Sequence, residues 1–507
     1  MSSFLLFAFV IGYFLLLLVV AWRTSRHSNN DSFFIGNRNS NWMLVAFGMI
    51  GTSLSGVTFV SVPGTVGDWA GDVHKAFGYF QVIIGYWFGY LVIAFILLPL
   101  YYRLHLTSIY NYLRSRFGSV AYRTGALFFI ISRTVGATAR LYLVINVLHI
   151  FILKDLGIPF ALTSLVILLM ILLYTFEGGV KTIVYTDTLQ TTFMLLGLCV
   201  CTVYILQNLH LSLGGAMQVL DAKGFTHVFN GDVKSKGFWG KQILGGMFIA
   251  IAMTGLDQEM MQKNISVKNA RDSKKNVVTF SFIMVLVSFL FLLLGGLLYL
   301  YSLQQGAVYQ GHTLLLGGKN VIGDDLFPTL ALHYLPSAVS IIFVIGLISA
   351  LFPSADGALT ALTSSFCIDL LNLRERKDMT EARLKRTRMT VHVSFAVLFL
   401  CCILVFKWVD NKSIVTAVLD LAGYTYGPLL GLFAFGIFTK RTLANTWKIT
   451  ALCLLAPVCC YFLSQYSARW LGGFQIGIEL LVINGMLTFL GLWALSAPAG
   501  EGVRRSV

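Results

Sequence analysis

The chain has 507 residues, of which 57% are hydrophobic and 12% are charged, and its mean hydropathy is +0.78. A soluble protein of this size needs more polar surface, so the composition predicts an all-α polytopic membrane protein whose helices form one body. The net charge of +15 does not indicate nucleic acid, because the basic residues follow the topology of the predicted helices.

Apolar segments long enough to cross a bilayer recur along the whole chain. The first lacks a preceding basic residue and a small-residue cleavage pattern, so we expect a retained helix and not a signal peptide. The segment 326–371 is too long for one crossing, and we expect Pro336 and Pro353 to divide it into a short outside helix near 326–334 and a crossing helix from 337 to 371. We predict about thirteen transmembrane helices, at residues 4–22, 42–66, 76–102, 121–153, 158–176, 186–208, 239–262, 277–301, 326–371, 390–408, 414–438, 445–467 and 474–496.

The distribution of Lys and Arg predicts how these helices are oriented. With the N-terminus outside, about 25 of these residues lie on the cytoplasmic side and about 10 lie outside, which is the positive-inside pattern. We therefore expect a multi-pass protein of the cell (plasma or inner) membrane with an outside N-terminus and a cytoplasmic C-terminus. Its basic loops would contact anionic lipid.

Two of the predicted spans contain a polar interruption. Residues 51–59, GTSLSGVTF, and residues 252–262, AMTGLDQEMMQ, place glycine with hydroxyl or charged residues where a membrane helix is normally apolar. The two spans are five apart when the first helix is set aside, so they would have opposite orientations, as in inverted repeats. Paired broken helices indicate a transporter site, where freed backbone groups hold ions and substrate. Close helix packing through small residues is the alternative.

Two aspartates in the predicted spans are candidates for cation binding. Asp187, in YTDTLQTT at 185–192, lies near the cytoplasmic start of its span, where the alternative is an N-cap. Asp356 lies with Ser354 in the hydroxyl-rich stretch ISALFPSADGALTALTSSF at 348–366. Hydroxyl, carboxylate and carbonyl oxygens suit Na⁺, a hard cation, whereas a single Ser or Thr more commonly bonds to its own helix.

Arg133 and Arg140 are seven residues apart in one predicted span and share a helix face. Arginine in the membrane is costly unless it is paired or faces water. One interpretation is a guanidinium clamp for a substrate carboxylate, and the other is an internal ion pair with an aspartate such as Asp257. Asp257 is also a candidate for binding a hydroxylated substrate. Glu259 and Lys263 have the i, i+4 spacing of a pair within one helix.

In the span 76–102, Phe77 and Gln81 share a helix face, which suggests a substrate wall or, for Gln81, a helix–helix hydrogen bond. The histidines show no metal-binding spacing. Enzyme motifs such as H-E-x-x-H, a Walker A loop or a nucleophile elbow do not occur, so we do not expect an enzyme.

From about Phe33 to Arg441 the chain resembles the sodium/solute symporter family. The resemblance lies in five stretches that occur in the family's order: FFIGNRNSNWMLVAFGMIGTSLSG, EGGVKTIVYTDTLQTTFMLLG, TGLDQEMMQKNISVKNA, SADGALTALTSSFCIDLL and LDLAGYTYGPLLGLFAFGIFTKR. It implies a five-plus-five inverted repeat of the leucine-transporter type. The implied units are an extra N-terminal helix in 1–30, core helices 1–5 in 31–209, core helices 6–10 in 210–441, and two C-terminal helices with a short tail in 442–507.

The same resemblance implies sites for Na⁺ as the coupling ion. The first site lies between core helices 1 and 8, with Pro353 standing where the family often has a second hydroxyl. Its implied ligands are the carbonyl groups of Gly51, Leu54 and Ala350 and the hydroxyl group of Ser354. Sialic-acid-type relatives suggest a second sodium site, which here would contain Asp187, with Asp356 and Gly357 at the relatives' serine positions.

The implied substrate site lies beside the broken helices, and Arg133 favours an acidic substrate, with a shift of that role to Arg140 left open. The candidate substrate residues are Ser53, Ser55, Thr58, Phe77, Gln81, Arg133 and Asp257. We therefore predict a sodium-coupled symporter that imports a small polar organic solute, a sugar or an organic acid such as sialic acid, by alternating access, acting as a monomer in the lipid bilayer. The alternatives are a proton-coupled transporter in which Asp187 or Asp356 titrates, and a membrane sensor or channel.

Overall fold

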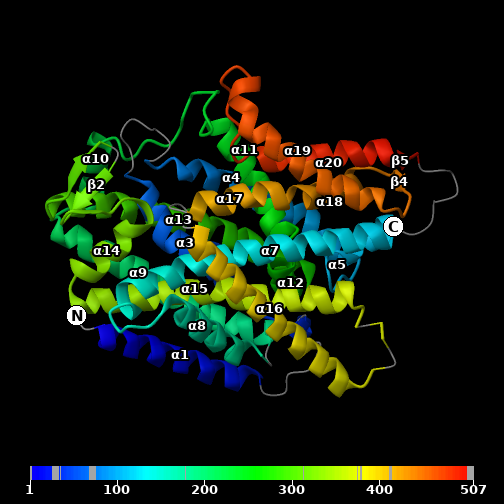
Figure 1. The fold of residues 1–507 in the computed structure, drawn as a ribbon, viewed down its shortest axis with the longest axis horizontal. Helices are drawn as coiled ribbons and strands as arrows, with labels where there is room; N and C mark the ends of the chain where they lie inside the picture. Colours follow the sequence, from blue (N-terminus) through cyan, green and yellow to red (C-terminus); the bar gives the residue numbers. More distant parts are fainter. Residues whose placement is uncertain are drawn as a thin grey trace.

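The computed structural model describes residues 3–25, 33–34, 36–67, 76–176, 179–311, 313–373, 375–376, 379–409 and 414–498. Most of its long helices run along one common direction (Figure 1). Helix α1 (Ser3–Ser25) lies on one flank of the bundle, and α19 (Lys448–Trp470) and α20 (Leu480–Leu495) lie on the opposite flank. The predicted boundary at residue 31, and Glu177 and Gly178 of the EGGVK motif, lie outside the described residues.

Every predicted span coincides with helix in this structure. The first half contains α3 (Trp42–Thr65), α4 (Tyr79–Val92), a π-helical turn (Ile93–Leu97), α5 (Leu98–Arg103), α6 (Asn111–Phe117), α7 (Ser119–Leu148), a second π-helical turn (His149–Leu153), α8 (Phe160–Thr175), α9 (Gly179–Asn208) and α10 (Leu213–Ala222). The second half contains α11 (Trp239–Ala250), a π-helical turn (Ile251–Gly255), α12 (Gln258–Ile265), α13 (Ala270–Gln304), α14 (Leu326–His333), α15 (Ser337–Ser365), a further π-helical turn (Phe366–Leu370), α16 (Glu381–Val409), α17 (Ile414–Thr425) and α18 (Gly427–Phe438).

Within the described ranges, nine helices are long and apolar enough to cross a membrane, or ten if the bent pair of α17 and α18 counts as one span. The apolar helices α8 and α20 are shorter than this limit, and the interrupted segment of α11 and α12 is not included in either number. These findings support a multi-pass membrane protein, and the predicted number of about thirteen crossings stays a prediction.

Small strands connect some of the helices. Strands β1 (Val308–Gln310), β2 (Thr313–Leu316) and β3 (Lys319–Asn320) form an antiparallel sheet between α13 and α14. Strands β4 (Thr442–Leu443) and β5 (Ser496–Ala497) pair antiparallel and tie the end of α18 to the end of α20. These strands were not predicted from the sequence.

Helices α3 and α15 form the centre of the bundle. In the most apolar part of each, 78% of the residues are buried, against 28% in α1 and 22% in α19. Helix α9 packs closely on α15, because Gly197 and Gly346 face each other: a Cβ atom on Gly197 would lie 3.3 Å from the Gly346 Cα atom. Polar residues on α3, α9 and α15 are therefore enclosed by protein, the setting in which intramembrane polar groups serve a function.

Both predicted interruptions are confirmed. In α3, Ser55 has φ 47° and ψ 174°, which breaks the regular helix at the middle of its span. In the second repeat, α11 ends in a π-helical turn, and Asp257 has an extended backbone before α12 begins. The Asp257 carboxylate caps α12 by accepting from the Glu259 N–H at 2.9 Å. Both spans are thus interrupted within the bundle.

The predicted helices near 326–334 and from 337 to 371 are confirmed by α14 and by α15 with the π-helical turn that follows it. The expected division at Pro353 is wrong: this residue lies inside α15, because a buried helix tolerates the loss of one N–H donor when its neighbours hold it in place. Helix α9 begins at Gly179, so Asp187 lies about two turns inside it. The N-cap interpretation of Asp187 is therefore excluded.

Candidate sodium and substrate sites

The predicted first sodium site lies where the break in α3 meets the middle of α15. A Cβ atom on Gly51 would lie 3.6 Å from the Pro353 Cγ atom, and one on Gly56 would lie 3.8 Å from the Ala350 carbonyl oxygen. The Gly51 N–H group donates to Thr191 Oγ1 of α9 at 3.1 Å, which fixes the chain just before the break. The backbone of residues 51–56 therefore faces residues 350–353 closely.

The groups at this junction suit a small hard cation. The non-helical Ser55 interrupts the series of i to i−4 hydrogen bonds, so carbonyl groups before the break lose regular partners. Ser354 is buried and donates its hydroxyl hydrogen to the Leu351 carbonyl at 3.1 Å, which leaves oxygen lone pairs available. Unwound carbonyl groups plus a hydroxyl oxygen are the donors that broken transporter helices offer Na⁺.

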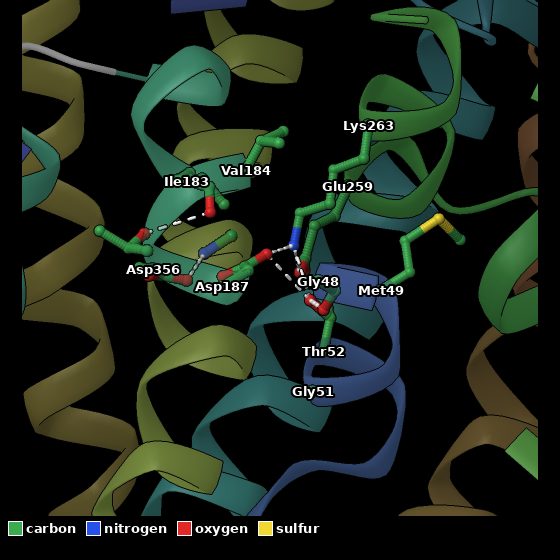
Figure 2. Close-up of polar contacts among 12 residues, drawn as sticks. Gly48, Met49, Gly51, Thr52, Ile183, Val184, Asp187, Glu259, Lys263 and Asp356 are labelled. Carbon is green, nitrogen blue, oxygen red and sulfur yellow. Dashed lines mark hydrogen bonds and ion pairs between the residues drawn. The ribbon is translucent and has the colours of Figure 1, made fainter. Parts of the chain in front are cut away.

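A buried cluster of charges contacts this junction at Thr52. Lys263 of α12 is 3% exposed, and its ammonium group lies 2.7 Å from Asp187 Oδ2 and 2.7 Å from Thr52 Oγ1. The same ammonium lies 3.6 Å from Glu259 Oε1. Figure 2 shows the Lys263 side chain reaching across to Asp187, with Thr52 and Glu259 beside its nitrogen. The predicted ion pair of Glu259 and Lys263 is present, and Lys263 also forms an ion pair with Asp187 of α9.

The other end of the cluster holds Arg133 of α7. Its guanidinium donates to Glu259 Oε2 and lies 3.8 Å from Asp257 Oδ2. The Tyr426 hydroxyl, at the bend between α17 and α18, donates to Asp257 Oδ2 at 3.0 Å. Arg133 therefore forms the internal ion pair that was one of its two interpretations, and it binds the second broken helix.

Asp356 has hydrogen-bond partners other than the lysine. Its Oδ2 atom accepts from the Tyr174 hydroxyl of α8 at 2.8 Å, and its Oδ1 atom accepts from the Gly357 N–H at 2.5 Å. Asp187 and Asp356 are both buried, and the hydrogen bonds of the described residues do not join their two carboxyl groups.

A cavity of about 500 Å³ lies beside the break in α3. Ser53, Ser55 and Thr58 line it, as do Tyr79 and Tyr86 from α4 and Arg140 from α7. An adjoining cavity of about 440 Å³ shares Ser53, Tyr86 and Arg140 with it and extends to Thr52 and Arg133. Both volumes include space that is open to solvent.

Two polar groups in this cavity have unused hydrogen-bonding capacity. The Ser53 hydroxyl is buried and has no hydrogen-bond partner among the described residues. Arg140 is half-buried, and the hydrogen bonds and ion pairs of the described part of the chain do not include it. A guanidinium without a carboxylate partner beside a free hydroxyl is a ready site for an anionic, hydroxylated molecule.

Phe77 lies just before α4, and Gln81 lies between the cavity-lining residues Tyr79 and Ile83. The Phe77 ring packs edge-on against Phe289 at 5.9 Å, and Gln81 Nε2 donates to the Gly78 carbonyl at 3.1 Å. Neither is among the residues that line the two cavities. Substrate contact by these two residues requires a shift of the start of α4.

Several residues of the site were not predicted from the sequence. Tyr79, Tyr86, Met253 and Met284 line the cavity, and their apolar surroundings gave no sign of this. Lys263 was detectable, because an ionisable residue within a span is a functional candidate, but its local pairing with Glu259 concealed the longer-range pair with Asp187.

Two interrupted helices around a polar cavity, within a bundle of apolar helices, define a secondary transporter. A model of the Sodium:solute symporter family matches residues 33–446, and the chain belongs to this family. The predicted resemblance is therefore confirmed.

Several characterised relatives span most of the chain. It is 23% identical over 515 residues to the sodium/sialic acid symporter SiaT of Proteus mirabilis, covering 98% of this chain and 97% of the relative. It is 24% identical to the sodium/sialic acid symporter NanT of Aliivibrio fischeri, in an alignment that covers 91% of this chain and 88% of the relative. It is 22% identical to sodium/glucose cotransporter 1 of Ovis aries, in an alignment that covers 85% of this chain and 68% of the relative.

Solved structures support the fold. A substrate-bound, outward-open sodium-coupled sialic acid symporter superposes with a TM-score of 0.80 at 19% identity, covering 98% of this chain and 99% of that chain. The nucleobase-cation-symport-1 family transporter Mhp1, in a closed conformation, superposes with a TM-score of 0.56 at 15% identity, covering 92% and 94%. The predicted all-α fold of the leucine-transporter type is confirmed by these neighbours.

Proposed function

We propose that this chain is a sodium-coupled symporter that imports a small, hydroxylated organic acid, with a sugar acid of the sialic acid type as the first candidate. The observation that carries the proposal is the Arg140 guanidinium in the cavity beside the break in α3, which has no ion-pair partner among the described residues. Sialic acid, which the relatives SiaT and NanT are named for, combines a carboxylate with hydroxyl groups. Those groups match an arginine and the hydroxyls of Ser53, Ser55 and Thr58.

Within this proposal the two arginines have different roles. Arg140 binds the substrate carboxylate, since Arg133 is already engaged by Glu259 and Asp257. Arg133 and Asp257, both candidates for substrate contact, then act mainly by holding the start of α12 in place. Removing Arg133 would leave buried carboxylates without a partner, which is costly in itself.

Sodium at the first site supplies the coupling. An ion shifts a conformational equilibrium only through its different affinities for the two states, so Na⁺ between α3 and α15 favours the arrangement in which both segments contribute ligands. Gly51, Leu54, Ala350 and Ser354 are the proposed ligands, with Pro353 packed against Gly51. Each Na⁺ that crosses 100 mV adds about 2.3 kcal/mol of driving force.

The organisation of the chain follows the same proposal. Residues 31–209 and 210–441 are the two inverted repeats, 1–30 contains an additional helix, and 442–507 contains two further helices and a tail. The protein acts as a monomer in the plasma or inner membrane with its N-terminus outside, without a nucleic-acid partner or an enzymatic step.

The test is the thermal stability of the purified protein in sodium and in potassium buffer, with N-acetylneuraminate, glucose, proline and lactate as probes. We expect a sodium-specific rise in melting temperature that Ser354→Ala removes, and a further rise with the sugar acid that Arg140→Gln removes. Arg123→Gln, at an exposed position on the same helix, should leave both intact. A rise with neutral sugars alone would refute the role of Arg140, and the absence of any sodium effect would favour proton coupling.

A further inference from the structure

A second sodium site does not fit the residues that would form it here. Such a site would use Asp187 together with residues 356 and 357, but Asp187 Oδ2 already accepts from Lys263 and Thr52. Both oxygens of Asp356 accept from Tyr174 and from the backbone. Within the described ranges, no group of three or more His, Cys, Asp or Glu side chains converges on a metal position.

The Glu259 side chain occupies the space beside Gly357. A Cβ atom on Gly357 would overlap Glu259 Oε1, and it would lie 2.7 Å from Cδ and 3.1 Å from Cγ of the same side chain. The Glu259 carboxylate therefore fills the space that a serine side chain at position 357 would need. This carboxylate lies 3.6 Å from the Lys263 ammonium, so the glycine makes room for an ionic partner of the lysine.

Lys263 has the surroundings that a bound monovalent cation would require. Its ammonium group carries one positive charge and is enclosed by a carboxylate oxygen of α9, a hydroxyl oxygen of α3 and a carboxylate of its own helix. Figure 2 shows these oxygens grouped at the end of the lysine chain. A buried lysine with such partners keeps its charge compensated.

We propose that the Lys263 ammonium takes the place of a second sodium ion, so that this symporter binds only the Na⁺ at the junction of α3 and α15. The inference rests on the proposed function. Because the ammonium is covalently attached, it links α12 to α9 and α3 and never leaves with the substrate. Transport of a monovalent acid with one Na⁺ then moves no net charge.

The experiment counts sodium ions bound to the purified protein by equilibrium binding of ²²Na⁺ without substrate. We expect one ion per wild-type chain and two per Lys263→Met chain, because the neutral methionine leaves Asp187 and Glu259 open to a mobile cation. Lys275→Met, which removes an exposed lysine that lies 3.8 Å from Asp272, should leave the number at one. The double variant Asp187→Asn with Lys263→Met removes both charges of the pair, and we expect it to fold and to bind one ion.

The outcomes separate this inference from the proposed function. Two ions on the wild type, falling to one in the double variant, would overturn the inference and leave sodium coupling intact. If the wild-type protein binds no sodium ion, the proposed function is overturned. Even then, a Lys263→Met protein that binds one ion more than the wild type would support the role of the lysine. An unchanged number in a folded Lys263→Met protein would refute that role.

Discussion

Substituting Gly357 with alanine should destabilise the protein strongly, although alanine is the better helix former. In an exposed helix the change would gain about 1 kcal/mol from helix propensity. At position 357 the added methyl group overlaps the Glu259 carboxylate and lies 2.7 Å from its Cδ atom, so the carboxylate must move away from Arg133 and Lys263. Disrupting a buried ion pair costs about 3–5 kcal/mol, which leaves a net loss of roughly 2–4 kcal/mol.

The assay is thermal unfolding in detergent, followed by intrinsic fluorescence, with Gly136→Ala as the control. Gly136 lies in α7 with nothing within 4 Å of an added Cβ atom, so alanine there should leave the melting temperature unchanged or raise it slightly. In a Glu259→Ala background the penalty at position 357 should nearly vanish, because the overlapping group is gone. Equal melting temperatures for Gly357→Ala and Gly136→Ala would refute this reasoning and show that Glu259 is free to reorient.

Three further predictions test other contacts. Tyr426→Phe removes the hydroxyl that donates to Asp257 and should cost about 1.5–3 kcal/mol of unfolding free energy; an unchanged melting temperature would contradict this. Thr191→Val removes the acceptor of the Gly51 N–H and should cost about 1–3 kcal/mol while weakening sodium binding, so unaltered sodium titrations would count against the first site. The hydrogen bond from Arg114 lowers the pKa of the exposed Glu375 below its usual 4.5. A carboxyl group whose pKa is lower in the folded than in the unfolded state stabilises the fold above its unfolded pKa, and this stabilisation is lost as the pH falls. Glu375→Gln should therefore lower the melting temperature slightly at pH 7 and not at pH 3. A difference that is constant with pH would exclude this origin.

Much of the architecture was predictable because it depends on local composition. Apolar length located the long helices but not the short α6 and α10, and glycine with hydroxyl residues in 51–59 predicted the non-helical Ser55. The same argument predicted the break before α12, where the extended Asp257 caps the helix. Pro336 marked the start of α15, since a proline at the first turn of a helix costs little.

The charge cluster was not predictable, because it depends on contacts between distant segments. Lys263 and Asp187 are separated by 76 positions and come together only when α12 packs against α9. Local spacing suggested a pair of Lys263 with Glu259 alone. The roles of Arg133 and Arg140 also depended on tertiary contacts: one helix face carries both residues, but among the described ion pairs only Arg133 binds carboxylates of the second broken helix.

The most direct test of the account is uptake of N-acetylneuraminate into proteoliposomes under an imposed inward sodium gradient. We predict accumulation that requires sodium, that is absent when potassium or choline replaces it, and that is lost in Ser354→Ala and in Arg140→Gln but kept in Arg123→Gln. Accumulation driven by a pH gradient without sodium, in protein that is shown to be folded, would contradict sodium-coupled import.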